Sequence, residues 1–115
     1  MIFNYTTTKK NEISIYTLKG ELIDREQPAA MMAEIENAIS NNSTRILLNM
    51  AELKSINSSG LNVIINILTK ARKAGGDVAI CCVSKKVNDL LIITKLNSVF
   101  NVCADEAKAF ELLSN

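Results

Sequence analysis

The segment from Ile46 to Ala74 places the tightest limit on what this chain can fold into. A short apolar run of strand length, Arg45-Ile46-Leu47-Leu48-Asn49-Met50, leads into a polar turn, Ser55-Ile56-Asn57-Ser58-Ser59-Gly60. After the turn, apolar residues recur every three or four positions, as one face of a helix requires: Leu61, Ile64, Ile65, Leu68 and Ala71. The segment therefore predicts a strand, a tight turn and an amphipathic helix in succession.

The turn places polar side chains where the helix begins, and two interpretations of them stay open. The first backbone N–H groups of a helix have no partner within it, and the helix dipole is positive there. Asn57 or one of the serines can therefore serve as an N-cap. The same position also favours a phosphate, so Ser58 or Ser59 can instead be a site of reversible phosphorylation. The residue pattern alone does not choose between a structural cap and a covalent switch.

The rest of the chain predicts strands and helices in alternation around this segment. Strands are expected at residues 2–8, 13–18, 45–50, 78–83 and 99–103. Helices are expected to begin near Pro28, at the serine turn, after Ser84 and after Asp105. The first two strands predict an antiparallel hairpin with the first at a sheet edge, and the later strand–helix–strand units require parallel, right-handed crossovers. We expect an α/β fold with a single domain over residues 1–115, a small mixed sheet and about four helices packed mainly on one face.

Composition and missing motifs exclude several classes of function. The chain has 13 basic and 12 acidic residues, a net charge of +1, and therefore no basic field for nucleic acid. It has no histidine, which excludes Ser-His-Asp and Cys-His catalysis from this chain alone and removes the commonest metal ligand. Glycine-rich phosphate-binding motifs are missing, and Ile56 stands where a nucleophile elbow would have its first glycine. The sequence predicts a protein that is not an enzyme and uses no cofactor, metal or nucleic acid.

The chain has three cysteines, and their oxidation state indicates the cellular compartment in which the protein is expected: Cys81, Cys82 and Cys103. Cys81 and Cys82 are adjacent in an apolar run, so in a strand their side chains would point to opposite faces. That arrangement suits neither zinc nor a simple disulfide, and an odd number of strand cysteines indicates reduced thiols. No apolar run reaches the length of a membrane span, and the first five residues do not resemble a secretion signal. We therefore expect a cytoplasmic protein with no direct membrane insertion.

Three sets of residues together resemble a known family. They are Gly20-Glu21-Leu22 after the second strand, the run 47–53 leading into Ile56-Asn57-Ser58-Ser59-Gly60-Leu61, and Gly75-Gly76-Asp77-Val78. This pattern is similar to the STAS domain family and, within it, to the bacterial anti-sigma factor antagonists. The resemblance covers essentially the whole chain, and the serine turn between strand and helix is its most specific motif.

The resemblance implies a partner-switching protein. Its cognate anti-sigma factor would also be a serine kinase that phosphorylates Ser58, with Ser59 as the second choice. The unmodified protein would bind that anti-sigma factor and release a sigma factor, and a serine phosphatase would reverse the modification. The residues implied in partner binding surround the serine: Asp24, Asn57, Ser59, Gly60, Leu61 and Asn62.

Two positions depart from the family pattern. Asn57 stands where the family usually has Asp before the serine, and Ile23 stands where an Asp usually follows Gly-Glu-Leu, with Asp24 one position later. If those acids help a kinase to hold the site, a second interpretation follows. The chain would then be a STAS interaction module that phosphorylation does not regulate, such as a subunit of a lipid-transport ATPase or of a sensory complex.

Overall fold

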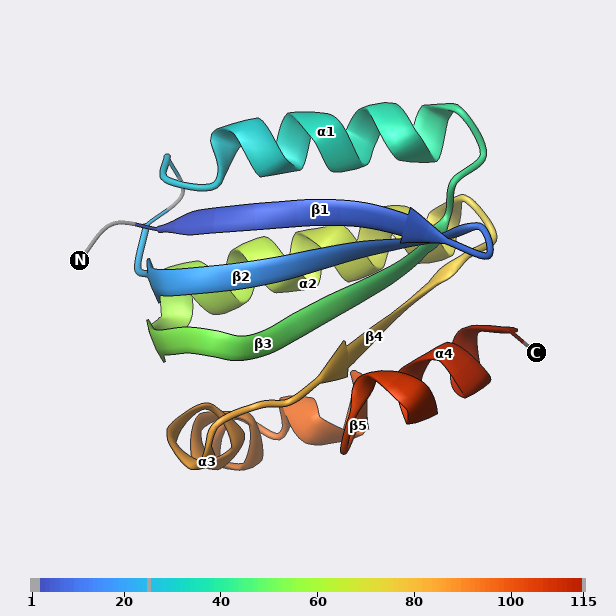
Figure 1. Cartoon of the computed structure of the whole chain (residues 1–115). Helices are drawn as coiled ribbons and strands as arrows, with labels where there is room; N and C mark the ends of the chain where they lie inside the picture. The colour runs from blue at the N-terminus through green and yellow to red at the C-terminus, as the bar shows by residue number, and fades with distance from the viewer. Residues whose placement is uncertain (1–2, 25, 115) are drawn as a thin grey trace.

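The computed structural model describes residues 3–24 and 26–114. Within them the chain forms a five-stranded sheet and four α-helices in the predicted order (Figure 1). The strands are β1 (Asn4–Lys10), β2 (Ile13–Leu22), β3 (Arg45–Ile56), β4 (Asp77–Cys81) and β5 (Asn101–Cys103). The helices are α1 (Ala29–Ser40), α2 (Ser58–Lys73), α3 (Lys85–Ile93) and α4 (Glu106–Ser114), and a 3-10 turn (Leu96–Ser98) follows α3.

The sheet has the strand order β1-β2-β3-β4-β5, with β1 at one edge as predicted. β1 and β2 pair antiparallel, whereas the later neighbours pair parallel, which confirms the predicted mixed sheet. Asn11 and Glu12 connect β1 to β2 with positive φ angles of 51° and 67°, the backbone conformation that a tight hairpin turn needs. The predicted start of this hairpin at Ile2 lies outside the described residues.

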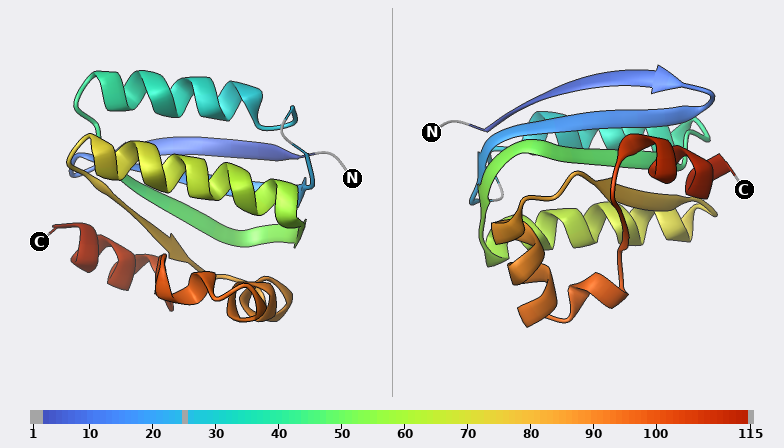
Figure 2. Two further views of the ribbon diagram at one scale, coloured as in Figure 1. Left: turned by 180° about the vertical axis from the view of Figure 1, so that it is seen from behind. Right: turned by 60° about the horizontal axis from the view of Figure 1, so that its bottom comes forward.

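Three helices cover one face of the sheet and the fourth covers the other face (Figure 2). On the first face, α1, α2 and α3 bury their apolar sides against the sheet and form the larger core. On the second face, α4 packs Ala109 and Leu113 against a smaller cluster that includes Ile13, Ile15 and Leu47. The prediction that helices pack mainly on one face is therefore confirmed.

The strand that leads to the serine turn is longer than predicted. β3 runs from Arg45 to Ile56, six residues beyond the apolar run that marked it in the sequence. Ala51 and Glu52 are exposed and interrupt the apolar pattern, but the backbone keeps its pairing with β2 through two register shifts, and Leu53 is buried again. The extra residues carry β2 and β3 side by side to Leu22 and Ile56, where the serine turn begins.

The prediction for the adjacent cysteines is wrong. β4 ends at Cys81, and Cys82 has a left-handed backbone with φ of 61°. Strand alternation therefore does not apply to Cys82, and both side chains contact the smaller cluster on the α4 face. All three cysteines are free thiols. In the described part of the chain, no helix combines the length and apolar character needed to cross a membrane.

Candidate functional site

Asn57 is the residue that caps α2. Its side-chain Oδ1 accepts a hydrogen bond from the Gly60 N–H at 3.0 Å, and its extended backbone, with φ of −121°, is typical of an N-cap. Its Nδ2 donates to the Ile23 carbonyl oxygen at 3.0 Å, and its backbone N–H donates to the Leu22 carbonyl oxygen at 3.4 Å. Asn57 therefore joins the end of β2 to the start of α2, and the capping role does not fall to a serine.

Ser58 is the first residue of α2 and is exposed. Within residues 3–24 and 26–114, the Ser58 hydroxyl makes no hydrogen bond that holds the turn. The cap of α2 is supplied by Asn57 instead. The Asn57 carbonyl oxygen also accepts from the Leu61 N–H at 2.9 Å. The first-turn N–H groups of Ser58 and Ser59 are thus left for solvent or for an anion.

The neighbours of Ser58 in the turn fall into an exposed and a buried set. Asn57 and Asn62 are exposed, and Ser59 is half-buried. Gly60 is buried so closely against β2 that a Cβ atom there would lie 2.2 Å from the Leu22 carbonyl oxygen. Leu61 is only 4% exposed and belongs to the larger core. Of the predicted partner-binding residues in the turn, Gly60 and Leu61 therefore present no side-chain surface in this structure.

Asp24 lies in the exposed loop between β2 and α1 and organises that loop. Its Oδ1 accepts from the backbone N–H groups of Glu26 at 3.0 Å and Gln27 at 2.7 Å. The Ile23 N–H in turn donates to the Gln27 side-chain oxygen at 3.1 Å. The Ile23 side chain is 41% exposed, and its carbonyl group is the one that Asn57 holds. Ile23 thus contacts the serine turn through its carbonyl group. The Asp24 carboxylate instead makes its hydrogen bonds within the β2–α1 loop.

An apolar groove adjoins the serine turn on the side of α3, and the prediction of site residues missed it. The groove has a volume of about 220 Å³ and is lined by Ile56, Lys86, Val87, Asp89, Leu90 and Ile93. Ile93 is 77% exposed, which is unusual for a large apolar side chain. The sequence did carry a signal for this groove. The helix around residues 85–93 has more apolar residues than one buried face can hold, which indicates that some of them are exposed.

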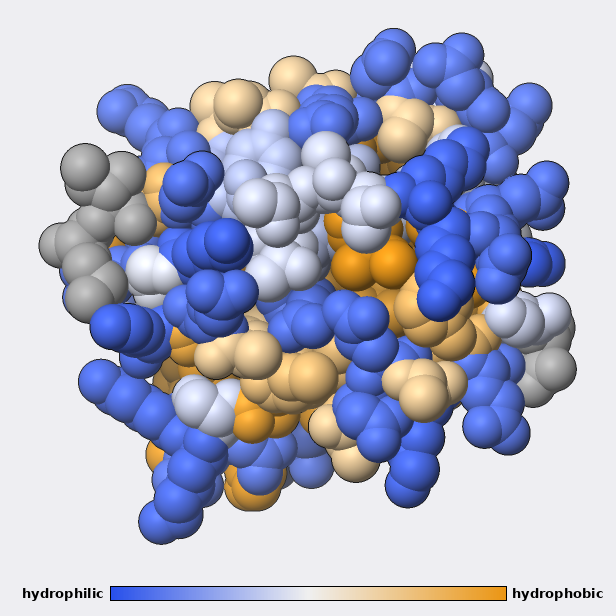
Figure 3. All heavy atoms as spheres, viewed as in Figure 1, coloured by the Kyte–Doolittle hydropathy of each residue, from blue (hydrophilic) through white to orange (hydrophobic). Residues whose placement is uncertain are grey.

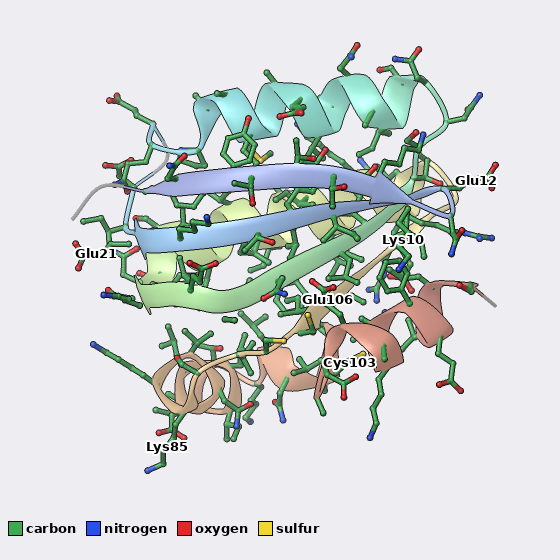
Figure 4. The ribbon with its side chains drawn as sticks, in the orientation of Figure 1. Lys10, Glu12, Glu21, Lys85, Cys103 and Glu106 are labelled. Atoms are coloured by element: carbon green, nitrogen blue, oxygen red, sulfur yellow. The ribbon has the colours of Figure 1, made fainter. Side chains whose placement is uncertain are left out.

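Opposite charges flank the beginning of α2. Acidic side chains, Glu21, Asp24 and Glu26, lie on the side of the β2–α1 loop, and basic side chains, Lys85 and Lys86, lie on α3. Glu21 and Lys85 are found at the same end of the molecule, where α2 begins (Figure 4).

A model of the STAS domain family matches residues 4–109 of this chain. The chain belongs to the STAS domain family. The Paenibacillus polymyxa anti-sigma F factor antagonist is 29% identical over 98 residues, which cover 84% of this chain and 83% of that protein. A second curated relative, a TM1081 homolog of Thermotoga neapolitana, is 33% identical, but the match spans only 59% of its length and 58% of this chain.

Solved structures share the fold of this STAS domain. The crystal structure of TM1081 from Thermotoga maritima aligns with a TM-score of 0.85 and 22% identity, covering 96% of this chain and 95% of that one. The Bacillus anti-sigma factor antagonist SpoIIAA in its unphosphorylated form gives 0.75 and 19% identity, covering 97% and 99%. Its phosphorylated form gives a TM-score of 0.74 with 18% identity. The relatives and solved structures described here are thus named anti-sigma factor antagonists.

Perturbed thiols of the STAS domain lie away from the serine turn. Burial raises the pKa of the Cys81 thiol, and a contact with Cys82 raises it further. Burial also raises the pKa of Cys103. A raised thiol pKa keeps the nucleophilic thiolate scarce at neutral pH. Among the described residues, no group of three or more Cys, Asp or Glu side chains is placed to hold a metal ion.

Proposed function

We propose that this STAS domain is an anti-sigma factor antagonist that is switched by phosphorylation of Ser58. In this proposal, an anti-sigma factor with serine kinase activity binds the unmodified protein and gives up its sigma factor. The same kinase then phosphorylates Ser58 and ends the complex, and a serine phosphatase restores the unmodified form. The protein itself acts by binding, not by catalysis, in keeping with a chain that contains no histidine.

One observation carries this proposal: Asn57 caps α2, which leaves the exposed Ser58 hydroxyl without a structural task. A serine that capped the helix would have to break a stabilising hydrogen bond, worth about 1 kcal/mol, before it could be modified. Ser58 carries no such cost. The phosphate would add about −1.5 to −2 charges beside the positive end of the helix dipole, where negative charge is favourable. Phosphorylation is therefore compatible with an unchanged fold.

The surface around Ser58 is suited to protein docking. We define the α2-start surface as Ile23, Ile56, Ser58, Asn62 and the α3 groove that ends at Ile93. Its apolar part supplies area that a partner can bury, and its polar part lies where a phosphate would stand. A phosphate at Ser58 would repel acidic partner groups and oppose close contact by its bulk. A loss of only about 3 kcal/mol in binding would weaken the complex by about two orders of magnitude.

The second interpretation, a binding module without phosphorylation, is supported by the two departures at residues 57 and 23. The structure gives a physical reason for Asn57 that does not involve a kinase. Its Nδ2 donates to the Ile23 carbonyl oxygen, a hydrogen bond that an ionised Asp could not make. Asn57 is thus fitted to both of its contacts. This fit explains why the turn holds without the family's usual acid.

The test is intact-mass spectrometry of the protein isolated from its own host, with fragmentation across residues 53–67. The proposal expects a phosphate on Ser58 in part of the population, none in a Ser58→Ala variant, and persistent modification in a matched Ser59→Ala variant. Because Ser58 is not the cap, Ser58→Ala should change the free energy of unfolding by less than about 0.5 kcal/mol. An unmodified Ser58 across growth conditions, together with a stable complex of the unmodified protein, would favour the second interpretation.

A further inference from the structure

Three thiols gather where β4 ends. β4 and β5 pair in parallel, and Cys81 lies directly opposite Cys103 in their register. Cys81, Cys82 and Cys103 all contact the smaller cluster on the face of α4, and the Cys81 thiol also contacts Cys82. All three are free thiols. The pairing of the two strands thus brings a third sulfur beside the two cysteines that are adjacent in the sequence.

Cys81 and Cys103 are placed as the two halves of a disulfide bond require. Neighbouring strands lie about 4.7–4.9 Å apart, which is within the Cα separation of about 4.4–6.8 Å that a disulfide spans. Both side chains are on the same face of the sheet, since both contact the smaller cluster. A bond between the adjacent Cys81 and Cys82 would instead close a small ring around a planar peptide, which is strained. The register therefore favours Cys81 with Cys103.

The two thiols differ in their access to solvent. Cys81 is fully buried, whereas Cys103 is half-buried and lines an open groove of about 700 Å³ beside α4 (Figure 4). Figure 3 shows hydrophobic atoms at the surface between α3 and α4. Burial and Asp105 raise the pKa of Cys103, and the Lys108 ammonium opposes them. A small oxidant therefore reaches Cys103 first, and the reaction is slow because the thiolate is scarce.

We propose that Cys103 and Cys81 form a reversible disulfide bond when the protein meets hydrogen peroxide. The Cys103 thiolate attacks one peroxide oxygen and the O–O bond breaks, which leaves a sulfenic acid on Cys103 and a hydroxide that takes up a proton to become water. The Cys81 sulfur then attacks the Cys103 sulfur and the S–O bond breaks. The Cys81 proton leaves with the hydroxyl group as a second water, so two thiols are oxidised and one peroxide is reduced. A dithiol reverses the reaction by thiol–disulfide exchange.

The bond would clasp the segment that carries α3. Residues 81–103 contain all of α3 and the 3-10 turn, and β5 returns this segment to the sheet through three residue pairs with β4. A disulfide that closes such a loop restricts the unfolded chain and so stabilises the folded one. In a reducing compartment a bond of this kind is transient and senses oxidants. The inference concerns the thiols alone and does not depend on the proposed function.

The test is peroxide treatment of the full-length protein, followed by alkylation of the remaining thiols in urea and intact-mass spectrometry. The unsubstituted chain has three free thiols before treatment. After treatment we expect one alkylated thiol, the mass of a single chain and the loss of two hydrogen atoms. Cys82→Ala is the matched control, because it removes the adjacent thiol and should still form the bond, with no thiol left to alkylate. Cys81→Ala and Cys103→Ala should form no bond.

A second measurement tests the clasp itself. The oxidised Cys82→Ala variant should have a urea midpoint about 1–3 M higher than the same variant after reduction, and equal midpoints would contradict the clasp. Circular dichroism of each variant establishes that the fold is retained.

Several outcomes would overturn the proposal. A treated chain that keeps three alkylated thiols, or whose thiols become sulfinic acids without a bond, does not form the disulfide. A bond that joins two chains contradicts its formation within one chain. A bond that persists in Cys81→Ala, or that is lost in Cys82→Ala, assigns the reaction to Cys82 and refutes the pairing drawn from the strand register.

Discussion

Gly60→Ala tests whether close contact between α2 and β2 shapes the serine turn. A Cβ atom at this position would lie 2.2 Å from the Leu22 carbonyl oxygen and 2.7 Å from Ile56 Cγ1. Ordinary van der Waals contact begins near 3.4 Å, so the helix start and the end of β2 would have to separate by about 1.2 Å. One obstacle is backbone, which a side-chain rotation cannot relieve.

The expected cost combines three terms. Alanine favours an α-helix over glycine by about 1 kcal/mol, which stabilises the variant. Overpacking a buried site costs about 1–3 kcal/mol, and a backbone obstacle places Gly60 near the upper end. The separation also stretches the hydrogen bonds from Asn57 to the Leu22 and Ile23 carbonyl groups, each worth about 0.5–1.5 kcal/mol. We expect a net destabilisation of about 2–3 kcal/mol.

Urea unfolding measures this loss. With a slope of about 1–3 kcal/mol/M, the midpoint of Gly60→Ala should fall by about 0.7–3 M. Ser59→Ala changes the preceding residue in the same helical turn and should stay within about 0.5 kcal/mol of the unsubstituted protein. A Gly60→Ala variant that is as stable as the unsubstituted chain, or more stable, would refute the close-contact argument and leave helix propensity as the only effect.

Three further predictions concern the cap and the titrating groups. In urea unfolding, Asn57→Ala should lose about 1–2 kcal/mol of stability, because the variant has no cap on α2. Asn57→Asp should lose less than about 1 kcal/mol, because its carboxylate still caps α2 and interacts favourably with the helix dipole. The remaining loss in Asn57→Asp comes from the missing hydrogen bond to the Ile23 carbonyl oxygen. The hydrogen bond to the Glu34 carboxylate raises the pKa of Tyr5 to about 12, so absorbance at 295 nm should show Tyr5 ionising well above pH 10, and Glu34→Ala should lower that pKa. Since the folded-state pKa is the higher one, the contribution of Tyr5 to stability is complete below pH 10 and is lost as the pH rises towards 12. Burial raises the pKa of Cys81, so a thiol reagent at pH 8 should label Cys81 far more slowly in the folded protein than in urea, and equal rates would contradict its burial.

Local residue patterns were enough to predict the order of elements. Alternation and helical spacing are properties of neighbouring residues, and the helix starts predicted after Ser84 and after Asp105 are confirmed. The side chains of these two residues accept hydrogen bonds from the N–H groups of Val87 and Lys108, as N-caps do. The end of β3 could not be predicted in this way. Ala51 and Glu52 look like the end of a strand, and only the backbone of β2, some 30 residues earlier in the chain, keeps that segment extended.

The same limit applies to the cysteines and to the last strand. Cys82 follows Cys81 in an apolar run, and nothing in that run indicates a backbone with positive φ. The strand predicted for residues 99–103 begins only at Asn101. The 3-10 turn after α3 extends the connection, and Phe100 is buried in the larger core, which α1, α2 and α3 form with the sheet. In each case the deciding contact comes from another element, so the pattern of neighbouring residues does not contain it.

The choice between a cap and a switch at the serine turn has the same origin. From the sequence, Asn57 and Ser58 are both acceptable caps, since each side chain can accept a hydrogen bond from the helix. In the fold, the Ile23 carbonyl group stands beside residue 57, and the Asn57 amide accepts from Gly60 through Oδ1 while it donates to Ile23 through Nδ2. An ionised aspartate could accept from Gly60 but could not donate to Ile23, so asparagine fits this position better than aspartate. With Asn57 occupied in this way, the stability of α2 does not depend on Ser58, and Ser58 can be exposed, modified or replaced at little cost to the fold.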